Sequence, residues 1–152
     1  MKKVLLIAIC LLLTGCINNY KNINHSEIKN NTNEIKKNDI KVSEIKVTIN
    51  EKEYKINLED NKTVEEFLSV LPKEYTMNDL NNNEKYVYID NSLTTNSYNP
   101  KHIEKGDVMI FGDNCLVIFY KSFDTSYSYT KIGHINDLKD IGNNNVVVKF
   151  EI

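Results

Sequence analysis

Four residues in the C-terminal half of the chain could form part of a ligand site. Tyr127, Tyr129 and Lys131 alternate with Ser and Thr, so in a regular strand their side chains would project from one face. Together with Tyr98 they could line a pocket in which the rings stack on an apolar ligand while hydroxyl and ammonium groups donate hydrogen bonds. The same spacing also suits tyrosines that pack on the flank of the domain with their hydroxyl groups in water.

The remaining reactive side chains favour structural roles. Cys115 opens a continuous apolar run and has no neighbouring histidine, which indicates a buried and unreactive thiol. His102 and His134, even with Asp107 or Asp113, lack a recognised metal-ligand spacing. The sequence contains no nucleophile elbow, phosphate loop or dinucleotide-binding fingerprint. We therefore expect no catalytic residue, no metal and no cofactor.

The N-terminus carries a second chemically informative group. Lys2 and Lys3 precede an apolar run from Val4 to Leu13, which is shorter than the roughly 20 residues of a membrane-spanning helix. The Leu-Thr-Gly-Cys sequence at residues 13–16 resembles the lipobox of bacterial lipoproteins, in which cleavage falls before the cysteine and its thiol accepts a diacylglyceryl group. The resemblance implies that residues 1–15 are a signal peptide and that Cys16 is the lipidated first residue of the mature chain.

This lipid would make the membrane a partner of the protein. Acyl chains on Cys16 would hold it at a cell membrane on the extracytoplasmic side, and two chains give stable anchoring where one is marginal. The alternative is an ordinary secretory signal followed by a coincidental cysteine. Residues 16–42 are rich in Asn and Lys without a sustained apolar period, so we expect a flexible tether. A short amphipathic helix from Glu27 to Lys37 is the alternative for this segment.

Composition narrows the classes of partner. The formal net charge is −2, with 21 acidic residues against 19 basic ones, and such a surface argues against nucleic acid. All basic residues are lysines, so no site can present a guanidinium group. If Cys10 leaves with the signal and Cys16 carries lipid, Cys115 has no intramolecular disulfide partner. We expect a monomer that a hydrophobic core stabilises.

The first predicted elements are a hairpin and a helix. Residues 45–49 and 54–58 alternate between apolar and polar side chains around a short turn, which predicts a β-hairpin with one buried face. Thr63 and Glu66 have the spacing of a capping box, with Thr63 as the N-cap. Apolar positions then recur on one helical face until a proline, which predicts one short helix at about residues 63–71.

Six further strands are predicted between Gly-Asp and Asn-rich turns. They cover Tyr75–Leu80, Tyr86–Ile89, Val108–Phe111, Cys115–Tyr120, Tyr127–Ile132 and Val146–Ile152. Many short strands with a single helix are typical of a mostly β domain, and a small barrel over residues 43–152 is the simplest arrangement.

The segments that carry the candidate site also resemble a known family. GDVMIFGDNCLVIFYKSF at residues 106–123 and TSYSYTKIG at residues 125–133 resemble the bacterial cyclophilin-like domain family, and residues 72–79 and 83–86 match its earlier blocks. The likeness extends over residues 45–152. It implies a small β-barrel related in shape to cyclophilin, with a pocket or groove on one side.

Three functions follow as hypotheses. The first is a surface lipoprotein whose barrel binds a small molecule or a peptide. The second is an enzyme, above all a peptidyl-prolyl isomerase acting on exported proteins; cyclophilins place an arginine against the proline nitrogen, and this chain has none. The third is a structural envelope protein, which a completely filled barrel interior would favour. The fold alone does not decide among them.

Overall fold

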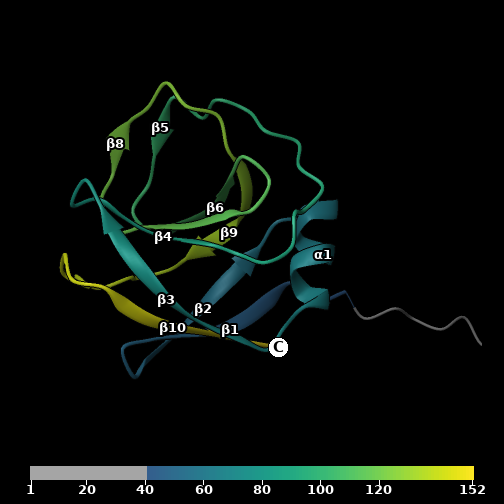
Figure 1. The fold of residues 1–152 in the computed structure, drawn as a ribbon, viewed down its shortest axis with the longest axis horizontal. Helices are drawn as coiled ribbons and strands as arrows, with labels where there is room; N and C mark the ends of the chain where they lie inside the picture. The colour runs from purple at the N-terminus through teal and green to yellow at the C-terminus, as the bar shows by residue number, and fades with distance from the viewer. Residues whose placement is uncertain (1–40) are drawn as a thin grey trace, which may run out of the picture. The chain divides into compact units, whose positions relative to one another are not determined.

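A computed structural model describes residues 41–152 of the chain. The predicted signal peptide, the lipidation site Cys16 and nearly all of the predicted tether lie outside the described residues. Figure 1 shows a ring of strands with one helix beside it and a pair of short strands set apart from the ring. The prediction of a mostly β barrel with one short helix is confirmed.

The barrel is closed by eight strands, each paired antiparallel with both of its neighbours. The order around the ring is β1-β10-β3-β4-β7-β6-β9-β2. The strands are β1 (Glu44–Ile49), β2 (Lys52–Leu58), β3 (Lys73–Leu80), β4 (Glu84–Tyr88), β6 (Asp107–Phe111), β7 (Cys115–Phe119), β9 (Thr130–Ile135) and β10 (Val146–Glu151). Closure leaves no unpaired barrel edge for another chain to extend.

The predicted hairpin is confirmed as β1 and β2. Asn50 and Glu51 connect the strands with positive φ angles of 44° and 69°, the left-handed conformation that matches the twist of a tight hairpin. Ile45 lies opposite Ile56 in the register, and both side chains are buried. The alternating pattern therefore places one apolar face of the hairpin inside the barrel.

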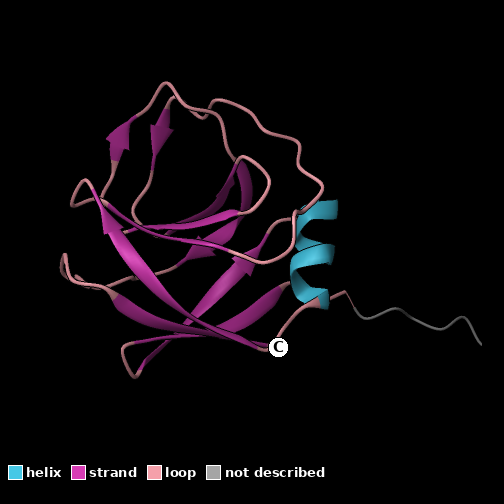
Figure 2. Ribbon diagram, viewed as in Figure 1, coloured by secondary structure: helices cyan, strands magenta, loops and turns pink. Residues whose placement is uncertain are grey.

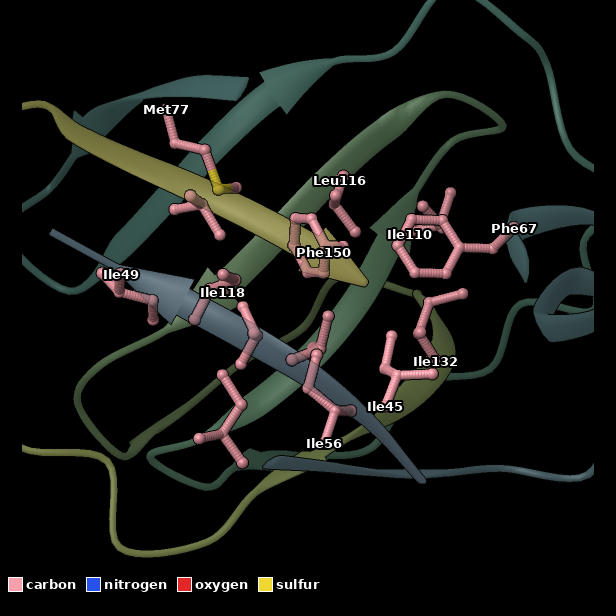
Figure 3. Packing of buried hydrophobic residues seen from close by; sticks show 14 of the residues in the cluster. Ile45, Ile49, Ile56, Phe67, Met77, Ile110, Leu116, Ile118, Ile132 and Phe150 are labelled. Atoms are coloured by element: carbon pink, nitrogen blue, oxygen red, sulfur yellow. The ribbon is translucent and has the colours of Figure 1, made fainter. Parts of the chain in front are cut away.

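The helix α1 (Lys62–Ser69) covers one end of the barrel. Its N-cap is Asn61, whose side-chain oxygen accepts a hydrogen bond from the Val64 amide at 2.9 Å. Phe67 points from the helix into the core and meets Phe150 of β10 edge to face, with ring centroids 5.4 Å apart (Figure 3). An aromatic side chain of this size contributes several kcal/mol when buried, so Phe67 fixes the helix to the barrel.

The predicted capping box is wrong, because Thr63 and Glu66 hold a distant loop instead. The Thr63 hydroxyl donates to the Thr94 carbonyl at 2.6 Å. The Glu66 carboxylate accepts from the Thr94 amide at 2.6 Å and from the Thr94 hydroxyl at 2.9 Å. These bonds tie the long connection after β4 to the helix.

Buried aliphatic and aromatic side chains fill the barrel interior (Figure 3). The cluster draws on every strand of the ring, with α1 closing it near the end of β10. Its largest fully buried members include Ile49, Ile56, Phe67, Met77, Ile110, Leu116, Ile118 and Phe150. A packed interior of this kind supplies most of the stability in a domain without disulfides.

A charged group lies among the side chains at the start of β4. Lys85 is fully buried, and its Nζ lies 2.6 Å from Asp79 Oδ1 and 2.8 Å from the Asn144 carbonyl oxygen. The Tyr120 hydroxyl donates to the same Asp79 oxygen at 2.6 Å, and Lys85 Nζ lies 4.6 Å from the Tyr120 ring centroid. The buried ammonium is thus paired, as a charge in a protein interior must be.

A second, smaller layer lies outside the barrel wall. The short strands β5 (His102–Ile103) and β8 (Phe123–Asp124) pair with each other, and sequence patterns did not predict them. Figures 1 and 2 show this pair on the side of β4 and β6, joined to the barrel by long loops. A second cluster of buried residues joins Ile103 of this pair to side chains on the outer face of the wall; the other members are Met109, Cys115, Val117, Phe119 and Tyr129.

One strand boundary differs from prediction in a way that matters for the site. The strand expected from Tyr127 to Ile132 begins at Thr130 and continues to Ile135. Tyr129 forms only an isolated bridge with Tyr98, and a register shift between Val108 and Met109 interrupts the pairing of β6 with β9.

Among residues 41–152, no helix has the length and apolar character that crossing a membrane would require.

Candidate ligand-binding site

Differences in side-chain size hollow the outer face of the barrel wall. β7 lies between β4 and β6, and it presents the small side chains of Cys115 and Val117 to the outside, where they join the outer cluster. Tyr88 of β4 lies opposite Cys115 on one side, and Phe111 of β6 lies opposite it on the other. Small residues between large ones leave a groove along β7.

This groove is a pocket of about 320 Å³, a volume at the lower end of the range for small-molecule sites. Its lining consists of Leu80, Asn81, Glu84, Tyr86, Tyr88, Phe111, Cys115, Val117, Tyr127 and Tyr129. The floor residues are buried, whereas Tyr88 and Tyr127 at the rim are 66% and 63% exposed. Clusters of exposed aromatic residues are a mark of binding surfaces, because a domain that has no partner is more stable when such residues are buried.

Two groups of aromatic rings form the walls of the pocket. On the β4 side, Tyr86 and Tyr88 meet edge to face with centroids 6.0 Å apart. On the opposite side, Phe111 contacts Tyr127 at 6.0 Å and Tyr129 at 5.6 Å. Edge-to-face contacts of this kind fix ring orientation, so both walls are formed before a ligand arrives.

Among the residues that the structure describes, Glu84 is the only one that brings a carboxyl group to the pocket lining. Its residue surface is 8% exposed, and no hydrogen bond or ion pair connects its side chain to another residue within 41–152. Burial, with a smaller contribution from the negative charge of Asp79, raises the pKa of Glu84 to about 7. Its carboxyl therefore meets only the solvent of the pocket, and carboxyl groups with a raised pKa in a cleft concentrate at functional sites.

The structure brings two of the four predicted ligand-site residues into this pocket. Tyr127 and Tyr129 belong to one wall. Tyr98 exchanges backbone hydrogen bonds with Tyr129 at 2.9 Å in both directions, but its own side chain is half exposed and outside the pocket lining. Lys131 is also outside the lining, because it lies within β9 and its Nζ is 3.1 Å from Asp107 Oδ1.

The family assignment follows from the same residues. A model described as the Cyclophilin-like family matches residues 47–151. The chain belongs to the Cyclophilin-like family. No curated protein and no solved structure matches the chain. The match agrees with the resemblance seen in the sequence, and it includes every residue that lines the pocket.

The remaining reactive groups of the cyclophilin-like domain are engaged in structural contacts. Cys115 lies in the pocket floor, and burial, together with the nearby Glu84, raises the pKa of its thiol. The His102 ring nitrogen lies 2.6 Å from Asp124 across β5 and β8. Within residues 41–152, no three His, Cys, Asp or Glu side chains are grouped as a metal site would require.

Asp107 organises the second polar cluster of the domain. His134 Nδ1 lies 3.0 Å from its Oδ1, and the Glu104 amide donates to its Oδ2 at 3.0 Å. Burial alone would raise the pKa of Asp107, but these donors and Lys131 outweigh it, and the pKa lies below the ordinary range. His134, the Glu104 amide and Lys131 thus engage both oxygens of Asp107, and Lys131 acts as its counter-ion.

Sequence reasoning missed Glu84 and three of the aromatic residues in the cyclophilin-like domain. Glu84, Tyr86 and Tyr88 alternate along one strand, and this signal could have placed all three on one face. Phe111 gave no comparable signal, because it ends a strand that is otherwise buried. Its role depends on β6 and β4 flanking β7, which only the topology reveals.

Proposed function

We propose that this protein is a membrane-anchored lipoprotein whose cyclophilin-like domain binds a small molecule or a peptide in the pocket on the outer face of β4, β7 and β6. The observation that carries the proposal is the combination of an exposed aromatic rim with Glu84, a buried carboxyl that has no partner among residues 41–152. Both features cost the free domain stability, and a ligand would offset both.

The chemistry of the pocket supports binding over covalent catalysis. The thiol of Cys115 in the lining has a raised pKa, whereas a nucleophilic cysteine needs a lowered one. No histidine from the described part of the chain lines the pocket to act with it or with Glu84. The pocket therefore offers shape, aromatic surface and one titratable carboxyl.

The lipid anchor rests on the sequence of residues 1–16. The Leu-Thr-Gly-Cys motif and the apolar run before it support acylation of Cys16, which would hold the domain at the extracytoplasmic face of a cell membrane. Mass spectrometry of the membrane fraction tests this directly. A mature chain that begins at Cys16 with a diacylglyceryl mass addition supports the anchor, and an unmodified Cys16 in that fraction overturns it.

A packed barrel interior, which would suit a purely structural protein, coexists with this pocket. Buried side chains fill the inside of the ring, but the pocket lies on the outside of the wall. Filling the interior therefore leaves the ligand site intact. An isomerase would need to hold a proline peptide, and a proline-peptide assay separates that activity from binding.

The binding proposal is tested with the full-length chain purified from its host in maltoside detergent. Native mass spectrometry should detect a retained small molecule or peptide that is lost from the Tyr88→Ala variant. Tyr88 is chosen because its exposed side chain contributes little to the fold. If neither retained nor added small molecules and peptides bind, or if they bind Tyr88→Ala equally well, the proposal fails.

A further inference from the structure

We propose that the ligand of this pocket carries an alkylated ammonium group, which lies between the aromatic walls and pairs with the Glu84 carboxylate. The inference rests on the proposed function, because it names the class of ligand for the same pocket. A free small molecule and a methylated amine on a peptide share this chemistry.

The first step concerns charge. Among residues 41–152, Glu84 is the only carboxyl group in the lining, and none of the lining side chains is basic. Lys85, its neighbour in sequence, is turned to the other side of the wall and pairs with Asp79. Because no cation of residues 41–152 reaches the carboxyl, a positive charge at Glu84 has to be supplied by a ligand.

The second step concerns the walls. Five aromatic residues line the same pocket as Glu84; they are Tyr86, Tyr88, Phe111, Tyr127 and Tyr129. The faces of such rings carry negative electrostatic potential and attract cations, and aromatic cages of this kind recognise alkylated ammonium groups. Ring faces and a carboxylate together favour a cation more than either does alone.

The third step concerns size and hydration. The pocket volume of about 320 Å³ accommodates a compact head group and a short tail. Its lining is largely apolar, with hydroxyl groups at the rings and one amide from Asn81. An alkylated ammonium loses less hydration on entry than a bare one, because its methyl groups already shield the charge.

The fourth step couples binding to pH. Among residues 41–152, the ionisable groups whose charges act on Glu84 are Cys115 of β7 and Tyr129 before β9 in the pocket, and Asp79 of β3, which lies with Lys85 on the other side of the wall. A cation binds only the ionised form of Glu84, whose pKa in the free protein is about 7. Affinity should therefore rise by about tenfold from pH 6 to pH 8 as the carboxyl loses its proton.

The experiment compares a cation with a neutral molecule of the same shape. Choline and its uncharged isostere 3,3-dimethylbutan-1-ol are titrated into the full-length chain in dodecyl maltoside at pH 8, with calorimetric detection. We expect choline to bind at least about tenfold more tightly than the isostere. Equal affinities would overturn the inference.

Two variants and a control locate the effect. Glu84→Gln keeps the side-chain shape and should abolish both the preference for choline and its dependence on pH, whereas Glu59→Gln, which removes an exposed charge, should change neither. Tyr88→Leu, which keeps the carboxyl but removes a rim ring, should weaken choline more than the isostere. A preference that survives in both Glu84→Gln and Tyr88→Leu contradicts the proposal, and Tyr88→Leu decides alone if Glu84→Gln does not fold.

A further arm separates the sources of the ammonium group and the two levels of the proposal. A short peptide that contains trimethyllysine presents the group on a backbone, and tighter binding of this peptide than of choline assigns the site to peptides. If neutral compounds bind in a manner sensitive to Tyr88→Ala but cations gain nothing, the ammonium inference fails and the proposed function stands. If nothing binds, both fail.

Discussion

Glu84 and Lys85 are adjacent in sequence yet lie on opposite sides of the barrel wall. The Lys85 ammonium is fully buried and lies 2.6 Å from Asp79, whereas the Glu84 carboxyl faces the outer pocket. Strand geometry causes this separation, because successive side chains point to opposite faces. The nearest lysine in sequence therefore cannot neutralise Glu84, and the pocket keeps an unpaired acid.

Replacing Glu84 by Gln should stabilise the free protein at high pH. Glu84 titrates at about 7 in the fold against a reference value of 4.5, so the folded state holds the extra proton between these values and wild-type stability falls as pH rises through them. Glu84→Gln cannot ionise and escapes this loss. Urea unfolding should show a gain for the variant of about 2 to 3 kcal/mol on going from pH 4 to pH 8. If the variant instead becomes less stable relative to the wild type over that range, Glu84 has a stabilising partner.

Replacing Lys85 by Met should destabilise the fold by about 3 kcal/mol, because it leaves the Asp79 carboxylate without its buried counter-ion. The matched control is Lys55→Met, which removes an exposed partner of Glu44 and should cost less than about 1 kcal/mol. Free energies of unfolding in urea measure both changes. Similar costs for the two variants would contradict the structural role of Lys85.

Gly106→Ala should destabilise the start of β6 more than Gly112→Ala destabilises its end. Both glycines have positive φ, 102° and 66°, so each substitution carries the backbone penalty of about 1 kcal/mol. A Cβ at Gly106 would also approach the Ile135 carbonyl oxygen to 2.3 Å, whereas nothing lies within 4 Å at Gly112. We expect at least about 2 kcal/mol between the variants in thermal or urea unfolding. Equal losses would show that the backbone near Ile135 yields freely.

The Cys115 thiol should react slowly with iodoacetamide. Burial and the nearby Glu84 raise its pKa, so little thiolate exists at pH 7.5. Labelling, followed by peptide mass spectrometry, should be at least about tenfold slower than for free N-acetylcysteine. A pocket ligand should slow it further, because Cys115 lies in the floor. Rapid labelling that choline leaves unchanged would place the thiol outside the occupied space.

Local patterns predict the elements in which apolar and polar side chains recur regularly within one contiguous segment. The β1 and β2 hairpin and α1 are predictable because the apolar residues of each element, Ile45, Ile56 and Phe67 among them, recur with the period of that element. The cap at Asn61 was missed because the capping-box spacing of Thr63 and Glu66 is equally suited to bonding Thr94, far along the chain.

The site was only half predictable because it is assembled from distant segments. Tyr127 and Tyr129 were selected from their spacing, although the segment lacks the regular strand that the spacing assumed. The same spacing includes Lys131, but the strand begins only one residue before it and its ammonium turns to Asp107. Glu84 stands out only once the fold buries most of its side chain and leaves its carboxyl facing the pocket, and neither is visible in a single sequence.

Tyrosine ring signals provide the most direct test of the pocket as a ligand site. The full-length chain, with ¹³C-labelled tyrosine and in dodecyl maltoside at pH 8, is titrated with tetramethylammonium and followed by NMR. Tyr54 and Tyr75 lie outside the pocket lining and serve as internal controls. The account predicts saturable shifts confined to the tyrosines of the pocket, which are Tyr86, Tyr88, Tyr127 and Tyr129. Signals that stay in place, or that move equally for the pocket tyrosines and the two controls, would contradict it.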